Sequence, residues 1–182
     1  YLTGAVNLTA PSVTLAVSQF GGIASAFSTT ATAGAGATNV GVAGSVSINR
    51  STNKSEATVK PASTVALAAN TDLTLSATSQ ASSAALAAPE GILGGSVGIG
   101  GAVAMNFATQ SARAEVQGAA SLAGTRNLSL TAAGNFTATT TAQAGAAGGT
   151  AVAASVALGL PTHQSIAGVL TDPAPTFTGT LS

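Results

Sequence analysis

The chain offers few side chains that could do chemistry. Its one histidine is His163, in the segment Pro161-Thr162-His163-Gln164, which is typical of a loop. A histidine can act as a general base, and two carboxylates at a suitable distance can share acid and base roles. No two acids lie close in sequence, so nothing here indicates a dyad, and we predict that the chain is not an enzyme. The acids are Glu56, Asp72, Glu90, Glu115 and Asp172.

Two of these acids follow a cation by two residues. Lys54 precedes Glu56, and Arg113 precedes Glu115, at nearly equivalent places in the chain. Residues two apart on a strand share a face. We therefore predict two surface ion pairs, which would each contribute only about 0–1 kcal/mol.

Metal and cofactor sites lack the residues that they need. There is no Cys, which excludes disulfides and thiolate ligands. Calcium-binding β-roll repeats need regularly placed Asp in Gly-rich nonapeptides, and these are missing. The Gly-rich segments 94–98 and 145–149 do not lead into the Gly-Lys-Ser/Thr of a phosphate loop. We expect packing or turn glycines there, with no cofactor, metal or small-molecule substrate.

Five asparagines match the glycosylation pattern Asn-x-Ser/Thr, which arises often by chance in so Ser/Thr-rich a chain. They are Asn7, Asn49, Asn53, Asn127 and Asn135. Asn49 and Asn106 each end a Val-rich segment. For these two we predict a turn or a ladder of stacked Asn side chains.

The composition excludes several classes of protein. Charged residues make up 5% of the chain, against about 25% in ordinary domains. The net charge is zero and the five cations are scattered, so a basic patch for nucleic acid is not expected. High apolar content with little charge also argues against disorder. Such a surface resists association poorly.

The organising feature is a period of about 55–60 residues, visible three times. The alternating Val-rich segment 40–49 recurs at 97–106 and at 152–158. A polar turn is expected next, followed by an Ala-x-Val strand at 57–59, 114–116 and 167–169. A Leu-x-Leu motif then recurs at 73–75 and 128–130, with Val13-x-Leu15 in the first copy.

The Val-rich segments alternate with period two, which predicts strands. The uncharged segment Gly91–Ala108 is long enough to suggest a membrane helix, but its strict alternation favours a strand, and we expect no membrane-spanning segment. One face, with Val97, Ile99 and Val103, is expected to face a core. The other face carries Gly, Ala and Ser, so another backbone layer could approach it closely.

These patterns predict an all-β fold, a β-solenoid of stacked wide rungs built from about three copies of the repeat. Like residues would stack in ladders, with Leu73 on Leu128, Val46 on Val103 and Val156, and Asn49 on Asn106. Each period would be one wide rung or two smaller rungs. The alternative is a β-sandwich. We interpret residues 1–182 as a single repetitive segment, an excerpt of a longer array, with a complete three-copy domain as the alternative.

Three of these segments also carry a family resemblance. Val-x-Ile-x-Gly-x-Val-x-Met-Asn (97–106), Ala-Arg-Ala-Glu-Val (112–116) and Asn-Leu-Ser-Leu-Thr-Ala (127–132) resemble repeats of very large bacterial surface exoproteins, the filamentous-haemagglutinin-like and leukotoxin-type filamentous adhesins. The resemblance covers nearly the whole chain, which departs from the usual pattern in its very low charge. It implies secretion to the bacterial cell surface, a β-solenoid shaft, and a role in adhesion, aggregation or biofilm.

The leading functional prediction is therefore a structural shaft of an extracellular adhesin or cell-surface fibre. Its partners would be further copies, head to tail or side by side through the small-residue faces, and a host or neighbouring-cell surface. Rows of Thr and Ser, such as Thr74 and Ser76 against Ser129 and Thr131, suggest an alternative, a module that binds polysaccharide or ice. A further alternative is the scaffold part of a larger secreted toxin.

Overall fold

The computed structural model describes residues 1–19, 24–89, 93–170 and 179–182, and all of its regular structure is β. Glu90, Gly91, Asp172, Phe20 and Phe177 lie outside the described residues. Within those ranges there is no helix that is long and apolar enough to cross a membrane. The strands are β1 (Ala5–Leu8), β2 (Ser12–Val17), β3 (Ser25–Ala33), β4 (Gly36–Ala37), β5 (Val40–Val59), β6 (Thr64–Pro89), β7 (Leu93–Gly94), β8 (Val97–Gln117), β9 (Ser121–Ala142) and β10 (Thr150–Leu170).

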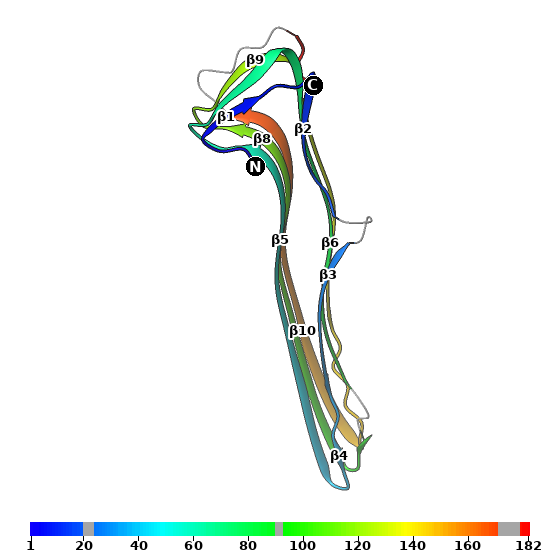
Figure 1. Ribbon diagram of the computed structural model, residues 1–182. Coiled ribbons are helices and arrows are strands. Elements are labelled where there is room, and N and C mark those ends of the chain that lie inside the picture. The colour runs from blue at the N-terminus through cyan, green and yellow to red at the C-terminus, as the bar shows by residue number, and fades with distance from the viewer. Residues whose placement is uncertain (20–23, 90–92, 171–178) are drawn as a thin grey trace.

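The strands form two main sheets, and the chain passes alternately between them. Sheet A has the order β10-β8-β5; in sheet B, β6 pairs with β1, β2 and β3 on one side and with β9 on the other. Every pairing between described strands is parallel, β4 with β7 included. Figure 1 shows the two sheets side by side along a narrow part, which opens into a wide end that also contains β1.

The register of the sheets matches the sequence period. Val46 pairs with Val103 and Val103 with Val156, while Leu73 pairs with Leu128. Each full period thus supplies one long strand to sheet A and one to sheet B. The predicted all-β class and the predicted ladders are confirmed, and the described strands show none of the antiparallel pairing typical of sandwiches.

The predicted turn after the Val-rich segment is wrong. β5 runs unbroken through Asn49 to Val59 and stays in register with β8. Polar side chains at 49, 51 and 53 turn inward and find hydrogen-bond partners on sheet B. Because those partners satisfy the polar groups inside the protein, the backbone remains extended where polarity suggested a loop.

The predicted inside and outside of sheet A are reversed. Ala102 and Ala104 of β8 are 2% and 0% exposed, whereas Val46 and Val156 beside them are 60% and 58% exposed. The small residues therefore fill the interior, and the branched apolar residues face outward. Lateral packing between copies through the small-residue face is excluded for this sheet, since that face already packs on sheet B.

The prediction that another backbone layer closely approaches the small-residue face of sheet A is confirmed. A Cβ added at Gly98 or Gly100 would collide with the carbonyl oxygens of Ala147 and Gly145. These two glycines let the segment that precedes β10 cross the inner side of β8. The Gly-rich segments are thus packing glycines, and no side chain larger than hydrogen fits at these two positions.

The core differs between the two ends of the molecule. In the wide end, large side chains from both sheets are fully buried: Val59, Val65, Leu73, Leu75, Val116 and Leu128. In the narrow part, the buried cluster consists of Ala85, Ala87, Ala102 and Ala104. Leucine burial contributes about 2–3 kcal/mol per side chain, so the wide end supplies most of the hydrophobic stabilisation.

Sheet B also joins segments that look separate in sequence. The segment Val65-Ala66-Leu67 and the Leu-x-Leu motif at 73–75 both belong to β6. An irregularity in the pairing with β9 separates them, and Asn70 adopts a left-handed conformation there, with φ 65°. Leu73 and Leu75 face inward, and Thr74 and Ser76 are partly exposed, as predicted.

Candidate functional site

One candidate surface is the outward side of sheet A, which we call the outer apolar face. By register, it presents rows of side chains that run across β5, β8 and β10. Its exposed large residues include Val42, Val46, Ile48, Ile99, Val152, Val156, Leu158 and Leu160, with exposed fractions from 41% to 65%. Extended apolar patches on soluble proteins are typical of interaction sites.

A shallow apolar groove crosses this face. Its floor is the row Gly44, Gly101 and Ala154, whose members pair across the three strands. The row Val46, Val103 and Val156 forms one wall, and by register the row Val42, Ile99 and Val152 flanks the other side. The groove has a volume of about 460 Å³. We call it the glycine groove.

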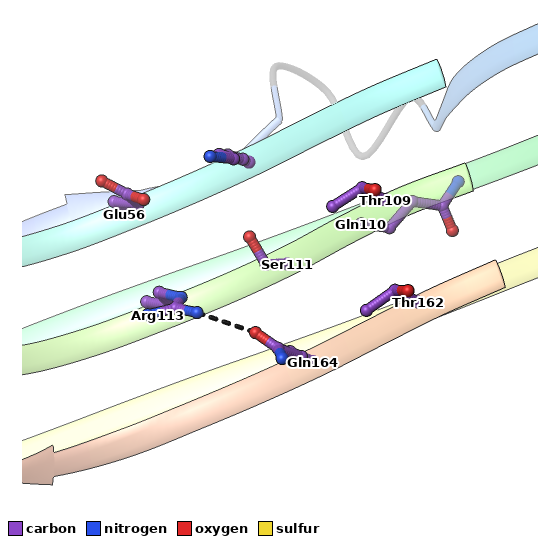
Figure 2. A pocket seen from close by; sticks show the side chains of 8 residues that line it. Glu56, Thr109, Gln110, Ser111, Arg113, Thr162 and Gln164 are labelled. Carbon is purple, nitrogen blue, oxygen red and sulfur yellow. Dashed lines mark hydrogen bonds between the residues drawn. The ribbon is translucent and has the colours of Figure 1, made fainter. Parts of the chain in front are cut away.

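A polar pocket lies on the same side of sheet A, nearer the wide end. Its volume is about 240 Å³. Figure 2 shows Glu56, Arg113 and Gln164 on three neighbouring strands, with Arg113 Nη2 donating to Gln164 Oε1 at 2.7 Å. Lys54, Thr109, Ser111, Thr162 and the otherwise buried Gln110 complete the lining. The pocket holds hydrogen-bonding groups of both kinds and no nucleophile paired with a base.

One of the two predicted ion pairs forms, and it is not a surface pair. Arg113 Nη1 lies 3.7 Å from Glu115 Oε1, and the Glu115 side chain is only 1% exposed. Gln117 also donates to Glu115. Lys54 does not pair with Glu56; instead Lys60 Nζ lies 3.5 Å from Glu56 Oε2.

The predicted Asn ladder forms in the interior of the protein. Asn49 Nδ2 donates to Asn106 Oδ1 at 3.3 Å, and Ser83 Oγ donates to the same oxygen at 2.6 Å. Asn106 Nδ2 donates to the backbone carbonyls of Ser83 and Thr139. Because Asn49 is 5% exposed, its glycosylation motif is inaccessible in the folded protein. This network ties the two sheets together in the narrow part.

The candidate catalytic residues are dispersed. His163 is exposed but lies in β10, not in the expected loop, with its ring centroid 5.5 Å from that of Phe136. Asp72 accepts from Arg126 at 2.9 and 2.6 Å, and this bonding holds the Asp72 pKa below its usual 3.8. In the described part of the chain, no three His, Cys, Asp or Glu residues gather where a metal ion could bind.

Sequence reasoning missed the outer apolar face and its groove. The valines and isoleucines were assigned to a core because large branched residues are usually buried. A usable signal was present further along the same strand. Ala57 and Val59 are an even number of residues from Ser47 and Asn49. In an unbroken strand all four must therefore lie on one side.

No protein-family model, curated protein or solved structure matches the chain. The resemblance to filamentous adhesins therefore stays a prediction.

Proposed function

We propose that the chain is a β-solenoid segment and serves as a structural shaft of an extracellular bacterial adhesin or cell-surface fibre. The observation that carries the proposal is the register: equivalent residues of successive periods pair directly in both sheets. A chain that adds one strand to each sheet per period grows along the axis perpendicular to its strands. Further periods would lengthen it without altering the units already in place.

The dimensions fit such a role. Neighbouring strands lie about 4.8 Å apart, so each period of this protein would lengthen the shaft by that amount. Backbone hydrogen bonds then run along the shaft axis, which resists stretching. The outermost strands of sheet A are β5 and β10, and their outer backbone edges can accept further strands of the same kind.

The distribution of functional groups agrees with a passive structural role. The described acids and histidine do not gather into one site. The charged residues of sheet A lie on the halves of β5 and β8 nearer the polar pocket and the wide end, and the other halves carry mainly small or apolar residues on their outward side. This arrangement supports a protein that associates with copies of itself.

Surface location is tested with antibodies raised against the purified chain. Intact cells of the source organism should be labelled as strongly as permeabilised cells. Labelling that appears only after permeabilisation would contradict an extracellular shaft.

The solenoid architecture is tested by electron cryomicroscopy of the purified chain at high concentration. Rods or filaments with a repeat of about 4.8 Å along their axis are expected. Globular particles without that repeat would contradict the shaft.

A second candidate, binding to polysaccharide or ice, has one favourable observation. Thr52, Thr109 and Thr162 stand in one row across sheet A, and the last two line the polar pocket. Elsewhere the Thr/Ser rows are irregular, since Thr78 pairs with Ala133. An ice-recrystallisation assay and a polysaccharide pull-down with Thr109→Val would test this alternative.

A further inference from the structure

We propose that the outer apolar face docks on the same face of a second copy of this chain, with the valine row of each copy seated in the glycine groove of the other. The proposal rests on the self-association part of the proposed function and names the surface through which it occurs. It replaces the small-residue face, which the fold buries between its own sheets.

The face is complementary to itself. The groove floor Gly44, Gly101 and Ala154 and the ridge Val46, Val103 and Val156 are adjacent outward rows of the same strands. The two rows are two positions apart in sequence, which is about 6.6 Å along a strand. A two-fold axis that lies between the two rows, parallel to them, places each ridge opposite the groove of the partner. Such an axis generates an isologous contact, the commonest kind in homodimers.

The spacing along the rows also matches. Members of a row are one strand apart, about 4.8 Å, in both copies. All three valines of a ridge therefore meet all three positions of the opposing floor at once. The same rotation acts on the neighbouring rows, so the row of Val42 in one copy faces the row of Ile48 in the other.

The area is large enough for a dimer, though a weak one. Six outward rows, from Val40 to Arg50 on β5, span about 40 Å along the strands, and three strands span about 14 Å across them. The product is about 560 Å² per copy, or about 1,100 Å² in total. Stable interfaces start near this size, since about 1,200 Å² in total is the lower end of the standard range. We therefore expect a dimer that dissociates on dilution in the micromolar range.

Charge on the face points to the same partner. Of the outward side chains in these six rows, only Arg50, at the border, is charged. A second copy brings no like charge against the valines. The outward side of sheet B, with Thr74, Ser76 and Thr131, carries hydroxyl groups instead and has no comparable apolar rows. Of the outward sides of the two sheets, the outer apolar face is thus the one whose burial would release the most free energy.

The test is sedimentation equilibrium of the full chain over a wide concentration range, with the variants Gly101→Val and Gly168→Val. A side chain at Gly101 fills the groove, and its Cβ meets no atom of the fold within 4 Å. Gly168 is the matched control, because it is equally open and lies outside the face, near the wide end. Circular dichroism establishes that each variant keeps its strand content.

We expect the wild type and Gly168→Val to dimerise with the same dissociation constant, and Gly101→Val to raise that constant at least tenfold. Val156→Lys, a variant of the ridge at a 58% exposed position, should do the same. A wild type that stays monomeric to millimolar concentration overturns the proposal, as does association that Gly101→Val and Val156→Lys leave unchanged. Equal weakening by Gly168→Val also overturns it. Cell labelling tests the shaft role separately, so either idea can fail alone.

Discussion

Replacing Asn106 by Ala tests how the narrow part of the molecule is held together. Asn106 is 1% exposed and lies on the inner side of β8. Its amide makes four hydrogen bonds: it accepts from Asn49 and Ser83, and it donates to the backbone carbonyls of Ser83 and Thr139. Asn49, Ser51 and Asn53 of β5 also bond to sheet B, but among the described residues Asn106 alone joins β8 to both β6 and β9 through side-chain hydrogen bonds.

The expected cost follows from those bonds. Each contributes about 1 kcal/mol net, and a buried partner left without a bond costs about 1–3 kcal/mol. Asn49 Nδ2 retains other acceptors, the carbonyls of Phe27 and Ala84, which limits the loss on that side. We therefore expect Asn106→Ala to lower the free energy of unfolding by about 3–4 kcal/mol.

Urea denaturation followed by circular dichroism measures this difference. The matched control is Asn135→Ala, because Asn135 is an exposed asparagine on β9, and we expect it to change the free energy by less than about 0.5 kcal/mol. A loss below about 1 kcal/mol for Asn106→Ala would refute the reasoning, since it would mean that the amide network does not join the sheets.

Three further predictions concern the core, the interior of the narrow part and the ion pair between Asp72 and Arg126. Leu73→Ala, at a fully buried position paired with Leu128, should lower the free energy of unfolding by about 3 kcal/mol in urea denaturation, and a loss below about 1 kcal/mol would contradict the core assignment. Ala104→Leu should overpack the narrow part and cost about 1–3 kcal/mol, also by urea denaturation; no change would mean that this side is open. Asp72→Asn should remove a stabilisation that is present above the ordinary carboxyl pKa and is lost as the pH falls through the lower folded-state pKa. The difference between wild type and variant, from denaturation curves at several pH values, should therefore shrink below pH 3.8; a difference that grows with acid would contradict the sign.

The period and the strand class could be predicted because they depend on local features. Alternation identifies a strand whichever side is buried. Equivalent residues of stacked periods must meet, so the pairs Val46–Val103 and Leu73–Leu128 followed from the spacing alone. The Asn ladder followed in the same way, since its two members occupy the same place in successive periods.

Alternation does not show which face of a strand is buried and which is exposed. Large branched residues usually lie inside, but in sheet A the small residues Ala102 and Ala104 are buried and Val46 and Val156 are exposed. A turn after Asn49 was predicted, and a turn would allow the segments before and after it to face different ways. The burial of Ala57 and Val59 therefore gave no prediction for the Val-rich segment. With the strand unbroken, burial of Val59 in the wide end forces Val46 and Ile48 outward.

The candidate surfaces were not predicted, for a related reason. The glycine groove appears only when Gly44, Gly101 and Ala154 are known to lie side by side and outward. The polar pocket combines residues from three periods, and no local pattern records that Glu115 is buried. Sequence spacing located the Arg113–Glu115 pair but gave no indication of its burial.

The most direct test of the account is cysteine accessibility along β8, because the chain has no Cys of its own. Single cysteines at Ile99, Gly101 and Val103 should react rapidly with a maleimide in dilute, monomeric protein. Cysteines at Ala102, Ala104 and Ala108, which are at most 2% exposed, should react only after unfolding. The reverse alternation, with the alanine positions reactive and the valine side protected, would contradict the arrangement of the sheets on which every proposal here depends.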